Sequence, residues 1–384
     1  MPPRRWDLFC KVVDNYGDAG VCWRLARQLV AEHALAVTLW LDDVAPLARM
    51  APGVDPDADM QLATGVTIRR WTAAFEVDAR PGDVVVEAFG CGLPDRYVDA
   101  MAQCTPAPTW IVLEYLSAER WVDATHALAS PHPRLPLARR YWFPGFTGAT
   151  GGLLRERGLL DARDAFRRDA AAQAAFLARI GVPAPEPGEL RISLFCYPAA
   201  PLAPLLDAWA DGDAPVTCLL PQGVATGALD AWAGGRVPPP GEALVRGRLR
   251  VHAVPFVAQD AYDRLLWSCA VNFVRGEDSF VRAQWAARPL VWHIYAQAEG
   301  AHLVKLDAFL DRYAAGLAPA AAAAVRRFWH AWNGDPGAGT LGDAWAGFAA
   351  ARPDLEPHAA KWAEALTTLP GLAAGLVKAT GNGL

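Results

Sequence analysis

The sequence predicts an α/β protein with two Rossmann-like domains followed by a helical tail. Three observations support this prediction. Short apolar runs alternate with helical patterns in both halves, glycine and proline gather between the halves, and no clear strand pattern follows about residue 300. A chain of 384 residues with 53% hydrophobic residues is also long and apolar enough for two full-sized cores.

Five apolar runs in the first half predict strands. They are Leu8–Val13, Ala36–Leu41, Val66–Ile68, Val84–Ala88 and Trp110–Leu113. Between the first two runs, Val21, Leu25 and Leu29 recur at helical spacing, which predicts a helix over Val21–Val30. Strands that alternate with helices in this way predict a parallel sheet covered by helices.

Breaker residues and changes of pattern set the predicted domain limits. Glycine and proline cluster from Pro144 to Gly152, so the N-terminal Rossmann-like domain is predicted over residues 1–152. A charged helical pattern and then a proline-rich run predict a helical linker region over residues 153–188. A C-terminal Rossmann-like domain over 189–345 and a helical tail over 346–384 complete the prediction, and the tail is expected to pack back on the N-terminal domain.

The second half repeats the alternation of the first. Its apolar runs are Ile192–Cys196, Val216–Leu220, Leu249–Val254, Ala270–Val274 and Leu290–Trp292. Two Rossmann-like halves with a helical tail are the outline of GT-B glycosyltransferases, in which substrates meet in the cleft between the halves. Dehydrogenases and other two-domain α/β proteins share this outline, so the fold alone assigns no function.

Composition and missing motifs exclude several classes. A net charge of −5 argues against a general nucleic-acid binder. The sequence contains no run of about 20 apolar residues, so no membrane span is predicted. Seven cysteines without a C-x-x-C pair favour a reduced, cytoplasmic protein. The eight histidines lack H-E-x-x-H or tight spacing, so no metal site is expected. Neither a nucleotide-binding P-loop nor a complete dinucleotide fingerprint occurs, since Asp95 replaces the third glycine after Gly90 and Gly92.

A polar turn follows the predicted strand Ala270–Val274 and precedes a predicted helix. It comprises Arg275, Gly276, Glu277, Asp278 and Ser279. Ligands of α/β domains bind outside the carboxyl ends of the strands. Arginine, serine and a helix N-terminus suit phosphate oxygens, and the acids suit sugar hydroxyls. A capped helix with a solvated charge cluster explains the same residues equally well.

A second polar turn follows the first predicted strand. It comprises Asp14, Asn15, Tyr16, Gly17 and Asp18. Two carboxylates four residues apart, in a loop made pliable by glycine, can face one site, where one acts as a base and the other orients the substrate. The alternative is a turn in which Asp18 only caps the following helix.

Aromatic side chains, an amide and a histidine lie at or after the ends of other predicted strands of the second half. They are Phe195, Tyr197, Phe256, Gln259, Tyr262, His293 and Tyr295. A nucleobase needs stacking faces and an amide that reads its edge, and this set supplies both. Each aromatic residue taken singly is more typical of a core, and His293 is more typical of a core histidine than of a ligand contact.

Four segments together resemble the EarP family of protein-arginine rhamnosyltransferases, which modify bacterial elongation factor P. The matching segments are Lys11–Asp18, Phe143–Thr147, Ser193–Tyr197 and Val274–Trp285. They lie in both halves, and the resemblance covers nearly the whole chain. It implies an inverting GT-B enzyme that transfers rhamnose from dTDP-β-L-rhamnose to an arginine of elongation factor P. It implies neither a cofactor nor a metal, and neither a nucleic-acid nor a membrane partner.

The resemblance also implies roles for individual residues. Asp18 matches the general base, Asp14 the second acid, and Asn15, Tyr16 and Gly17 belong to the acceptor-side loop. The residues implied to contact the thymine are Phe195, Tyr197, Phe256 and Gln259. Glu277 is implied at the ribose, and the residues implied at the diphosphate region are Arg275, Asp278, Ser279 and Tyr295. The family usually has phenylalanine at position 262, which is Tyr262 here. A GT-B enzyme with another donor or acceptor, or a non-catalytic nucleotide-sugar-binding protein, remains the alternative.

Overall fold

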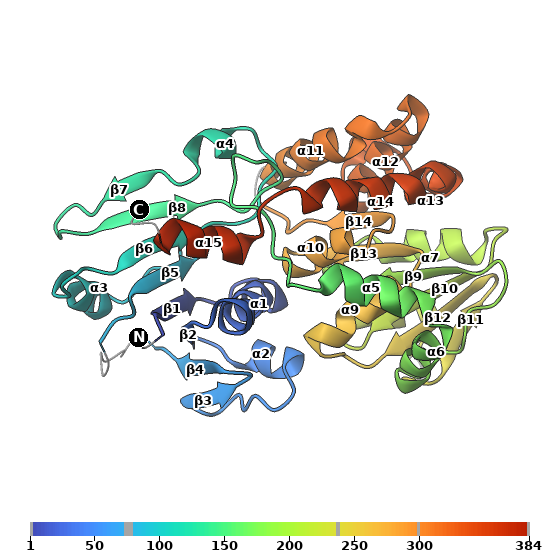
Figure 1. Cartoon of the computed structure of the whole chain (residues 1–384). Helices are drawn as coiled ribbons and strands as arrows, with labels where there is room; N and C mark the ends of the chain where they lie inside the picture. The colour runs from blue at the N-terminus through green and yellow to red at the C-terminus, as the bar shows by residue number, and fades with distance from the viewer. Residues whose placement is uncertain (1–2, 73–79, 236–238, 298–299, 382–384) are drawn as a thin grey trace. The chain divides into compact units, whose positions relative to one another are not determined.

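The computed structural model of the chain describes residues 3–72, 80–235, 239–297 and 300–381. Its contacts divide the chain into two compact units, each built around one sheet (Figure 1). Unit 1 comprises Met1–Arg157 with Thr367–Leu384, and unit 2 comprises Gly158–Leu366. The predicted domain limits at residues 152, 188 and 345 stay predictions.

Unit 1 contains a sheet of eight strands in the order β3-β4-β2-β1-β5-β6-β8-β7. The strands are β1 (Arg5–Cys10), β2 (Ala36–Leu41), β3 (Met60–Ala63), β4 (Val66–Arg70), β5 (Val84–Ala88), β6 (Thr109–Leu113), β7 (Ala129–Pro131) and β8 (Ala138–Trp142). The edge strands β3 and β7 pair antiparallel with their neighbours, and the six strands between them are parallel. The carboxyl ends of these six strands therefore share one edge of the sheet, where ligands of such folds bind.

The helices of unit 1 are α1 (Tyr16–His33), α2 (Ala45–Met50), α3 (Asp95–Ala102), α4 (Trp121–Thr125) and α15 (Leu372–Gly381). Helix α15 comes from the end of the chain and packs in the same core as α1 and β1, where Leu8, Leu25 and Leu376 are buried together. The backbone N–H of Leu372 also donates to the carbonyl of Leu153 at 2.9 Å. These contacts hold the C-terminal helix on unit 1.

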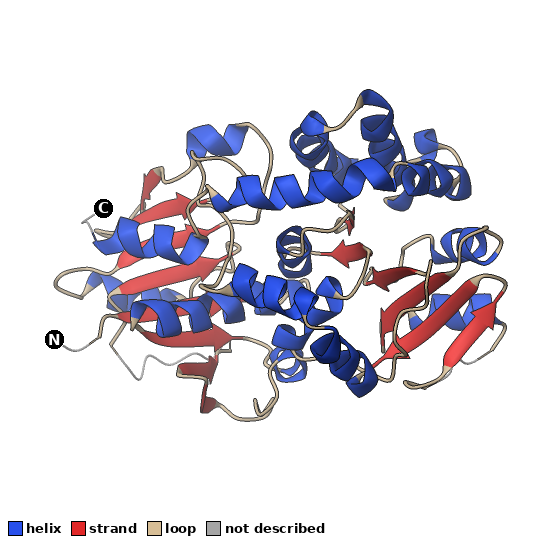
Figure 2. Ribbon diagram, turned by 45° about the vertical axis from the view of Figure 1, so that its right-hand side comes forward, coloured by secondary structure: helices blue, strands red, loops and turns tan. Residues whose placement is uncertain are grey.

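Unit 2 contains a sheet of six strands in the order β11-β12-β10-β9-β13-β14. The strands are β9 (Leu190–Leu194), β10 (Val216–Pro221), β11 (Ala243–Arg246), β12 (Leu249–Val254), β13 (Val271–Arg275) and β14 (Leu290–His293). All neighbours are parallel except β11 and β12. Strands β9, β10 and β13 are almost wholly buried and read as apolar runs, as expected of parallel strands covered by helices. Figure 2 shows helices packed beside the strands.

The helices of unit 2 are α5 (Leu159–Arg168), α6 (Ala170–Arg179), α7 (Leu202–Ala210), α8 (Thr226–Ala233), α9 (Gln259–Trp267), α10 (Asp278–Trp285), α11 (Ala301–Tyr313), α12 (Pro319–Trp332), α13 (Leu341–Ala350) and α14 (Arg352–Thr367). Aromatic contacts attach α12 and α13 to the sheet. The ring centroid of Phe273 on β13 lies 5.2 Å from that of Trp332 and 6.3 Å from that of Trp345. Such contacts explain why the late helical segment packs on this unit.

The structure confirms the α/β prediction and corrects several elements. Strands Ala36–Leu41, Val84–Ala88 and Leu249–Val254 have the predicted bounds. The first strand is wrong at both ends, since it spans Arg5–Cys10 rather than Leu8–Val13. It ends early because carboxylates bind the next backbone N–H groups: Asp42 accepts from Val12 and Asp18 from Val13.

Four strands escaped prediction, namely β3, β7, β8 and β11. Three of them, β3, β7 and β11, are edge strands that pair antiparallel with a single neighbour, and none of their residues is buried. Strand β8 has the sequence Ala-Arg-Arg-Tyr-Trp, and its two arginines interrupt the apolar pattern that predicts a strand. Edge strands depend on pairing rather than on their own hydrophobicity, so a pattern of apolar residues misses them.

Candidate functional site

The loop between β1 and α1 is organised by the buried carboxylate of Asp18. This side chain is 2% exposed, and its Oδ2 accepts hydrogen bonds from the backbone N–H of Val13 at 2.9 Å and of Asp14 at 2.8 Å. On the other side, Asp42 Oδ1 accepts from the N–H of Val12 at 2.8 Å. Two carboxylates thus fix three consecutive backbone N–H groups. Asp18 also lies in the first turn of α1, where the helix dipole favours a negative charge.

Asp14 lies on the same loop and is half-buried. The backbone N–H of Gly17 donates to its carbonyl at 2.7 Å. A Cβ atom at Gly17 would lie 2.5 Å from Asp14 Oδ2, so the carboxylate occupies the space that a side chain would fill. Asn15 between them has a φ of 40°, a left-handed conformation that asparagine tolerates better than most residues. The structure therefore brings the two predicted acids together on one short loop.

The remaining loop residue, Tyr16, is tied to α2. Its hydroxyl receives a hydrogen bond from Arg49 Nη1 at 2.5 Å, and the Arg49 guanidinium lies 5.6 Å from the centre of its ring. This contact anchors the start of α1 to the helix that follows β2.

Burial raises the pKa of Asp18 above its ordinary value. Hydrogen bonds from the backbone of Asp14 and Val13, and from the side chain of Tyr115, act in the opposite direction but do not cancel the loss of hydration. The negative charge of Asp42 adds a smaller upward contribution. A carboxylate with a raised pKa is a stronger base than one in water, which suits proton abstraction.

Two aromatic residues beside this loop were not predicted as site residues. Tyr115, which hydrogen-bonds Asp18, follows β6, and its ring stacks on that of Phe89 with centroids 4.5 Å apart and planes at 16°. Phe89 directly follows β5. The signal that could have found them is the one used for Phe195, since each comes within two residues of a predicted strand end.

In unit 2, Arg275 joins two predicted base-stacking residues. Its guanidinium carbon lies 4.8 Å from the ring centre of Phe195 and 4.5 Å from that of Tyr197, and Nη1 donates to the carbonyl of Cys196 at 3.4 Å. A cation over aromatic faces is attracted by the ring quadrupole. The structure thus brings together the cation at the end of β13 and the aromatic side chains after β9.

The predicted phosphate-binding turn is closed by its own serine. Ser279 Oγ accepts from the backbone N–H of Arg275 at 3.1 Å and donates to the carbonyl of the same residue. Gly276 between them has a φ of 58°, which glycine adopts without a steric penalty. Glu277 is half-buried immediately before α10. The turn conformation therefore comes from backbone contacts that the residue types alone did not reveal.

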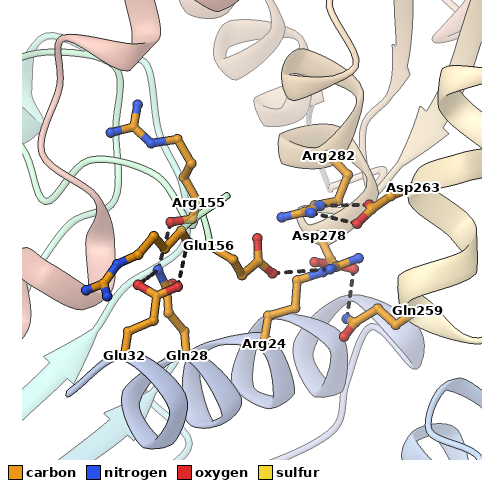
Figure 3. Close-up of polar contacts among 10 residues, drawn as sticks. Arg24, Gln28, Glu32, Arg155, Glu156, Gln259, Asp263, Asp278 and Arg282 are labelled. Atoms are coloured by element: carbon orange, nitrogen blue, oxygen red, sulfur yellow. Dashed lines mark hydrogen bonds and ion pairs between the residues drawn. The ribbon is translucent and has the colours of Figure 1, made fainter. Parts of the chain in front are cut away.

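Two buried side-chain pairs connect α9 with α10 (Figure 3). Gln259 Nε2 donates to Asp278 Oδ2 at 3.0 Å. One helical turn further along, Arg282 binds Asp263 through two hydrogen bonds of 2.8 Å and 2.6 Å. The second pair was not predicted. It fixes α10 and so holds the turn that precedes it.

The other predicted donor residues lie at the same edge of unit 2. Tyr262 lies 5.9 Å from the ring of Phe195, and its burial raises its pKa, so the hydroxyl stays protonated. Phe256 follows β12 and is half-buried. Tyr295 is 51% exposed, and its ring meets that of Tyr197 edge-on at 5.5 Å.

His293 supports the backbone of Tyr197. Its Nδ1 accepts from the backbone N–H of Tyr197 at 3.1 Å, and its side chain is buried. Burial, aided by the charge of Arg275, lowers the pKa of His293 to about 4. It is therefore neutral near pH 7 and positions Tyr197, as a satisfied core histidine does.

One face of α1 is bound to the chain that follows β8 (Figure 3). Arg24 Nη1 lies 3.3 Å from Glu156 Oε1, and Gln28 Nε2 donates to the carbonyl of Arg155 at 2.7 Å. Glu32 Oε1 accepts from the backbone N–H of Arg157 at 2.6 Å. These contacts hold the helix whose first turn carries Asp18.

Within the ranges that the structure describes, no three histidine, cysteine, aspartate or glutamate side chains are grouped to hold a metal ion. In the same ranges, each helix is too short or too polar to cross a bilayer.

Comparison with known proteins gives one consistent family. The profile of the family described as elongation-factor P (EF-P) rhamnosyltransferase EarP matches residues 6–380. A protein-arginine rhamnosyltransferase of Pseudomonas putida is 50% identical over 99% of this chain and 99% of its own length. One of Pseudomonas aeruginosa is 47% identical over 97% of this chain and 98% of its own length.

Solved structures agree with the sequence relatives. One solved structure describes the basis of EarP-mediated arginine glycosylation of translation elongation factor EF-P. It is 40% identical to this chain with a TM-score of 0.71, and the match covers 99% of this chain and 100% of the other. The calicheamicin glycosyltransferase CalG4 has a TM-score of 0.50 at 11% identity, covering 100% of both chains, which shows the fold alone. The architecture is that of GT-B glycosyltransferases.

Proposed function

The chain belongs to the EarP family and is a protein-arginine rhamnosyltransferase, and from that premise we propose that it transfers rhamnose from dTDP-β-L-rhamnose to an arginine of elongation factor P. The observation that carries the proposal is the pair of acids on the β1–α1 loop. Asp18 is buried with a raised pKa, and the backbone N–H of Asp14 on the same loop donates to it. A guanidinium acceptor requires one group that binds the cation and one that accepts its proton.

An arginine side chain is a poor nucleophile because its guanidinium is charged and delocalised, with a pKa above about 12. In the proposed reaction Asp14 binds the cation and Asp18 accepts a proton from the attacking nitrogen. The new bond from that nitrogen to the anomeric carbon forms as the bond from the carbon to the dTDP oxygen breaks. One in-line displacement inverts the anomeric centre and needs no covalent intermediate. The approaching cation keeps both carboxylates ionised.

The proposed donor site is the carboxyl edge of unit 2. Phe195 and Phe256 would stack on the thymine, with Tyr197 and Gln259 fixing it. Arg275 suits the diphosphate, because its face already lies on two rings while its N–H edge can bind phosphate oxygens. Positive charge at this place stabilises the leaving dTDP.

The remaining proposed donor contacts place Glu277 at the ribose. Asp278, Ser279 and Tyr295 complete the diphosphate region. Asp278 and Ser279 act partly through the turn, since their side chains hold Gln259 and the backbone of Arg275 in place.

A cytoplasmic location is part of the proposal. The proposed acceptor is a translation factor, and the seven cysteines form no disulfide, as expected in a reducing compartment.

The test is the mass of intact elongation factor P after incubation with this enzyme and dTDP-β-L-rhamnose. The expected result is the addition of one deoxyhexose, located on an arginine by fragmentation. Elongation factor P with that arginine replaced by lysine is the control and should gain no mass. An unchanged acceptor mass under conditions in which calorimetry shows donor binding would contradict the proposed donor–acceptor pair.

A further inference from the structure

We propose that Phe89 and Tyr115 form an aromatic platform that binds the flat face of the acceptor arginine while Asp14 and Asp18 bind its edge. This inference rests on the proposed function, since it assumes a guanidinium acceptor. It adds a binding surface to a site otherwise described by its acids alone. We call this stacked pair the aromatic platform.

The topology of unit 1 brings the platform to the acid loop. Strand β5 pairs with β1 on one side and with β6 on the other. Phe89 leaves β5 with its backbone N–H bound to the carbonyl of Leu113 at 2.6 Å, and Tyr115 leaves β6 two residues after Leu113. Both residues therefore emerge at the carboxyl edge, next to the strand that leads into the acid loop.

The conformation of Phe89 shows that the stack is specifically built. Its φ of 57° is in the left-handed region, which a bulky residue adopts at an energetic cost. The next residue, Gly90, is also left-handed, with a φ of 60°, so the backbone turns sharply directly after β5. In this conformation the ring of Phe89 lies nearly parallel to that of Tyr115, at 4.5 Å and 16°.

Tyr115 connects the platform to the proposed base. Its hydroxyl hydrogen-bonds Asp18, and one ring face is covered by Phe89. Tyr115 is nevertheless 37% exposed. An aromatic ring that is stacked on one face, exposed elsewhere and bonded to a buried carboxylate is a receptor for a planar cation.

The chemistry of the guanidinium explains why such a receptor fits. Stacking uses only the face of the group, so all its N–H donors stay available to carboxylates in the plane. A guanidinium on the Tyr115 ring would direct its edge toward the acid that the hydroxyl of the same ring contacts. The platform thus restricts rotation of the nucleophile, and it distinguishes arginine from lysine, whose ammonium has no flat face.

The test compares steady-state kinetics of Tyr115→Leu, Phe89→Leu and Tyr115→Phe with the parent enzyme, using unmodified elongation factor P and dTDP-β-L-rhamnose. Tyr115→Leu should raise the KM for elongation factor P by roughly 3- to 30-fold, as the loss of a cation–π contact implies. The KM for the donor should stay within about twofold of the parent. Phe89→Leu should raise the acceptor KM in the same direction by a smaller factor, because the ring that meets the cation remains.

Tyr115→Phe separates the ring from the hydroxyl. It should keep the acceptor KM of the parent but move the acidic limb of the pH–rate profile to higher pH, because the hydrogen bond that lowers the pKa of Asp18 is lost. A purely structural tyrosine would not produce this split. An acceptor KM that rises tenfold in Tyr115→Phe would overturn the platform in favour of the hydroxyl.

Trp121→Leu is the matched control. Trp121 is a 50% exposed aromatic residue of unit 1 that contacts Phe143 edge-on at 5.2 Å, and its replacement should leave both KM values unchanged. Equal acceptor KM values for Tyr115→Leu, Phe89→Leu and Trp121→Leu would overturn the inference. If a leucine variant fails to bind dTDP or to unfold cooperatively, the acceptor KM and the pH–rate profile of Tyr115→Phe decide whether the platform binds the acceptor. Absence of transfer by the parent would instead contradict the proposed function.

Discussion

The acid loop of unit 1, residues 14–18, and the turn Arg275–Ser279 of unit 2 both combine acids with a glycine. They differ in the groups that bind their side chains. In the acid loop, Asp18 accepts from two backbone N–H groups and a tyrosine hydroxyl, and its burial raises its pKa. At the other turn, Asp278 is bound by Gln259 and Ser279 by the backbone of Arg275. The first arrangement leaves a basic carboxylate, whereas the second builds a rigid frame around a cation.

The comparison assigns different tasks to acids that look alike in the sequence. A base needs a lone pair whose affinity for a proton has been increased, which burial of the carboxylate achieves. A binding turn needs fixed geometry, which paired side chains achieve. We therefore place proton abstraction in unit 1 and donor binding in unit 2.

The largest expected effect on stability comes from the frame of unit 2. Asp263→Ala leaves the buried guanidinium of Arg282 without its carboxylate and should lower the free energy of unfolding by about 3–5 kcal/mol. Urea denaturation followed by tryptophan fluorescence measures this change. Asp164→Ala removes the partner of Arg163, but Asp164 is 48% exposed, so that variant should change stability by less than about 1 kcal/mol. Equal losses would show that burial does not strengthen the frame.

Gly17→Ala tests whether the acid loop needs its packing. The new Cβ would collide with the Asp14 carboxylate, so the rate of transfer should fall by roughly 100-fold, the order expected when a group that positions the substrate is displaced. Gly227→Ala is matched in position, because both glycines are second in their helices, but it meets open space. Its activity should equal that of the parent. A fully active Gly17→Ala enzyme would remove Asp14 from the proposed mechanism.

Arg275→Gln tests the cation inside the frame. Loss of a charge-assisted contact to phosphate should weaken dTDP binding by on the order of tenfold to 100-fold, measured by calorimetry. Arg264→Gln on the exposed side of α9 is the control and should bind dTDP as the parent does. Unchanged affinity in Arg275→Gln would move the diphosphate away from this turn.

The pH dependence of the rate gives the smallest effect. Proton abstraction requires ionised Asp18, so kcat/KM should fall as the pH drops through the raised pKa of this group, which lies above the ordinary aspartate value of 3.8. Asp42→Asn removes a negative charge that raises that pKa, and the acidic limb should shift slightly to lower pH. A shift to higher pH would contradict the assignment of the limb to Asp18.

Much of this arrangement was predictable from local sequence. Apolar runs located the central strands, and the strand-end rule located both turns and the residues of the donor edge. What escaped prediction depends on partners distant in the chain. Asp42 ends the first strand by binding Val12, which lies 30 positions away in the chain. Gln259 pairs with Asp278, which lies 19 positions away. Neither contact has a periodic signal.

The aromatic platform illustrates the same limit. Phe89 and Tyr115 lie on separate strands and become neighbours only because β5 and β6 are paired in the sheet. From sequence alone, each is an ordinary aromatic residue after an apolar run. Sheet order, which periodicity does not determine, is the missing information.

Single-turnover transfer by Asp18→Asn tests the central claim most directly. Enzyme in excess is mixed with elongation factor P at saturating dTDP-β-L-rhamnose, and the modified acceptor is followed by intact mass. The amide keeps the shape of the carboxylate but not its basicity, so the rate should fall by about 10²- to 10⁴-fold while the Kd for dTDP stays within about twofold. Transfer at the parental rate, or an equal loss of donor binding, would contradict the placement of the base in the acid loop.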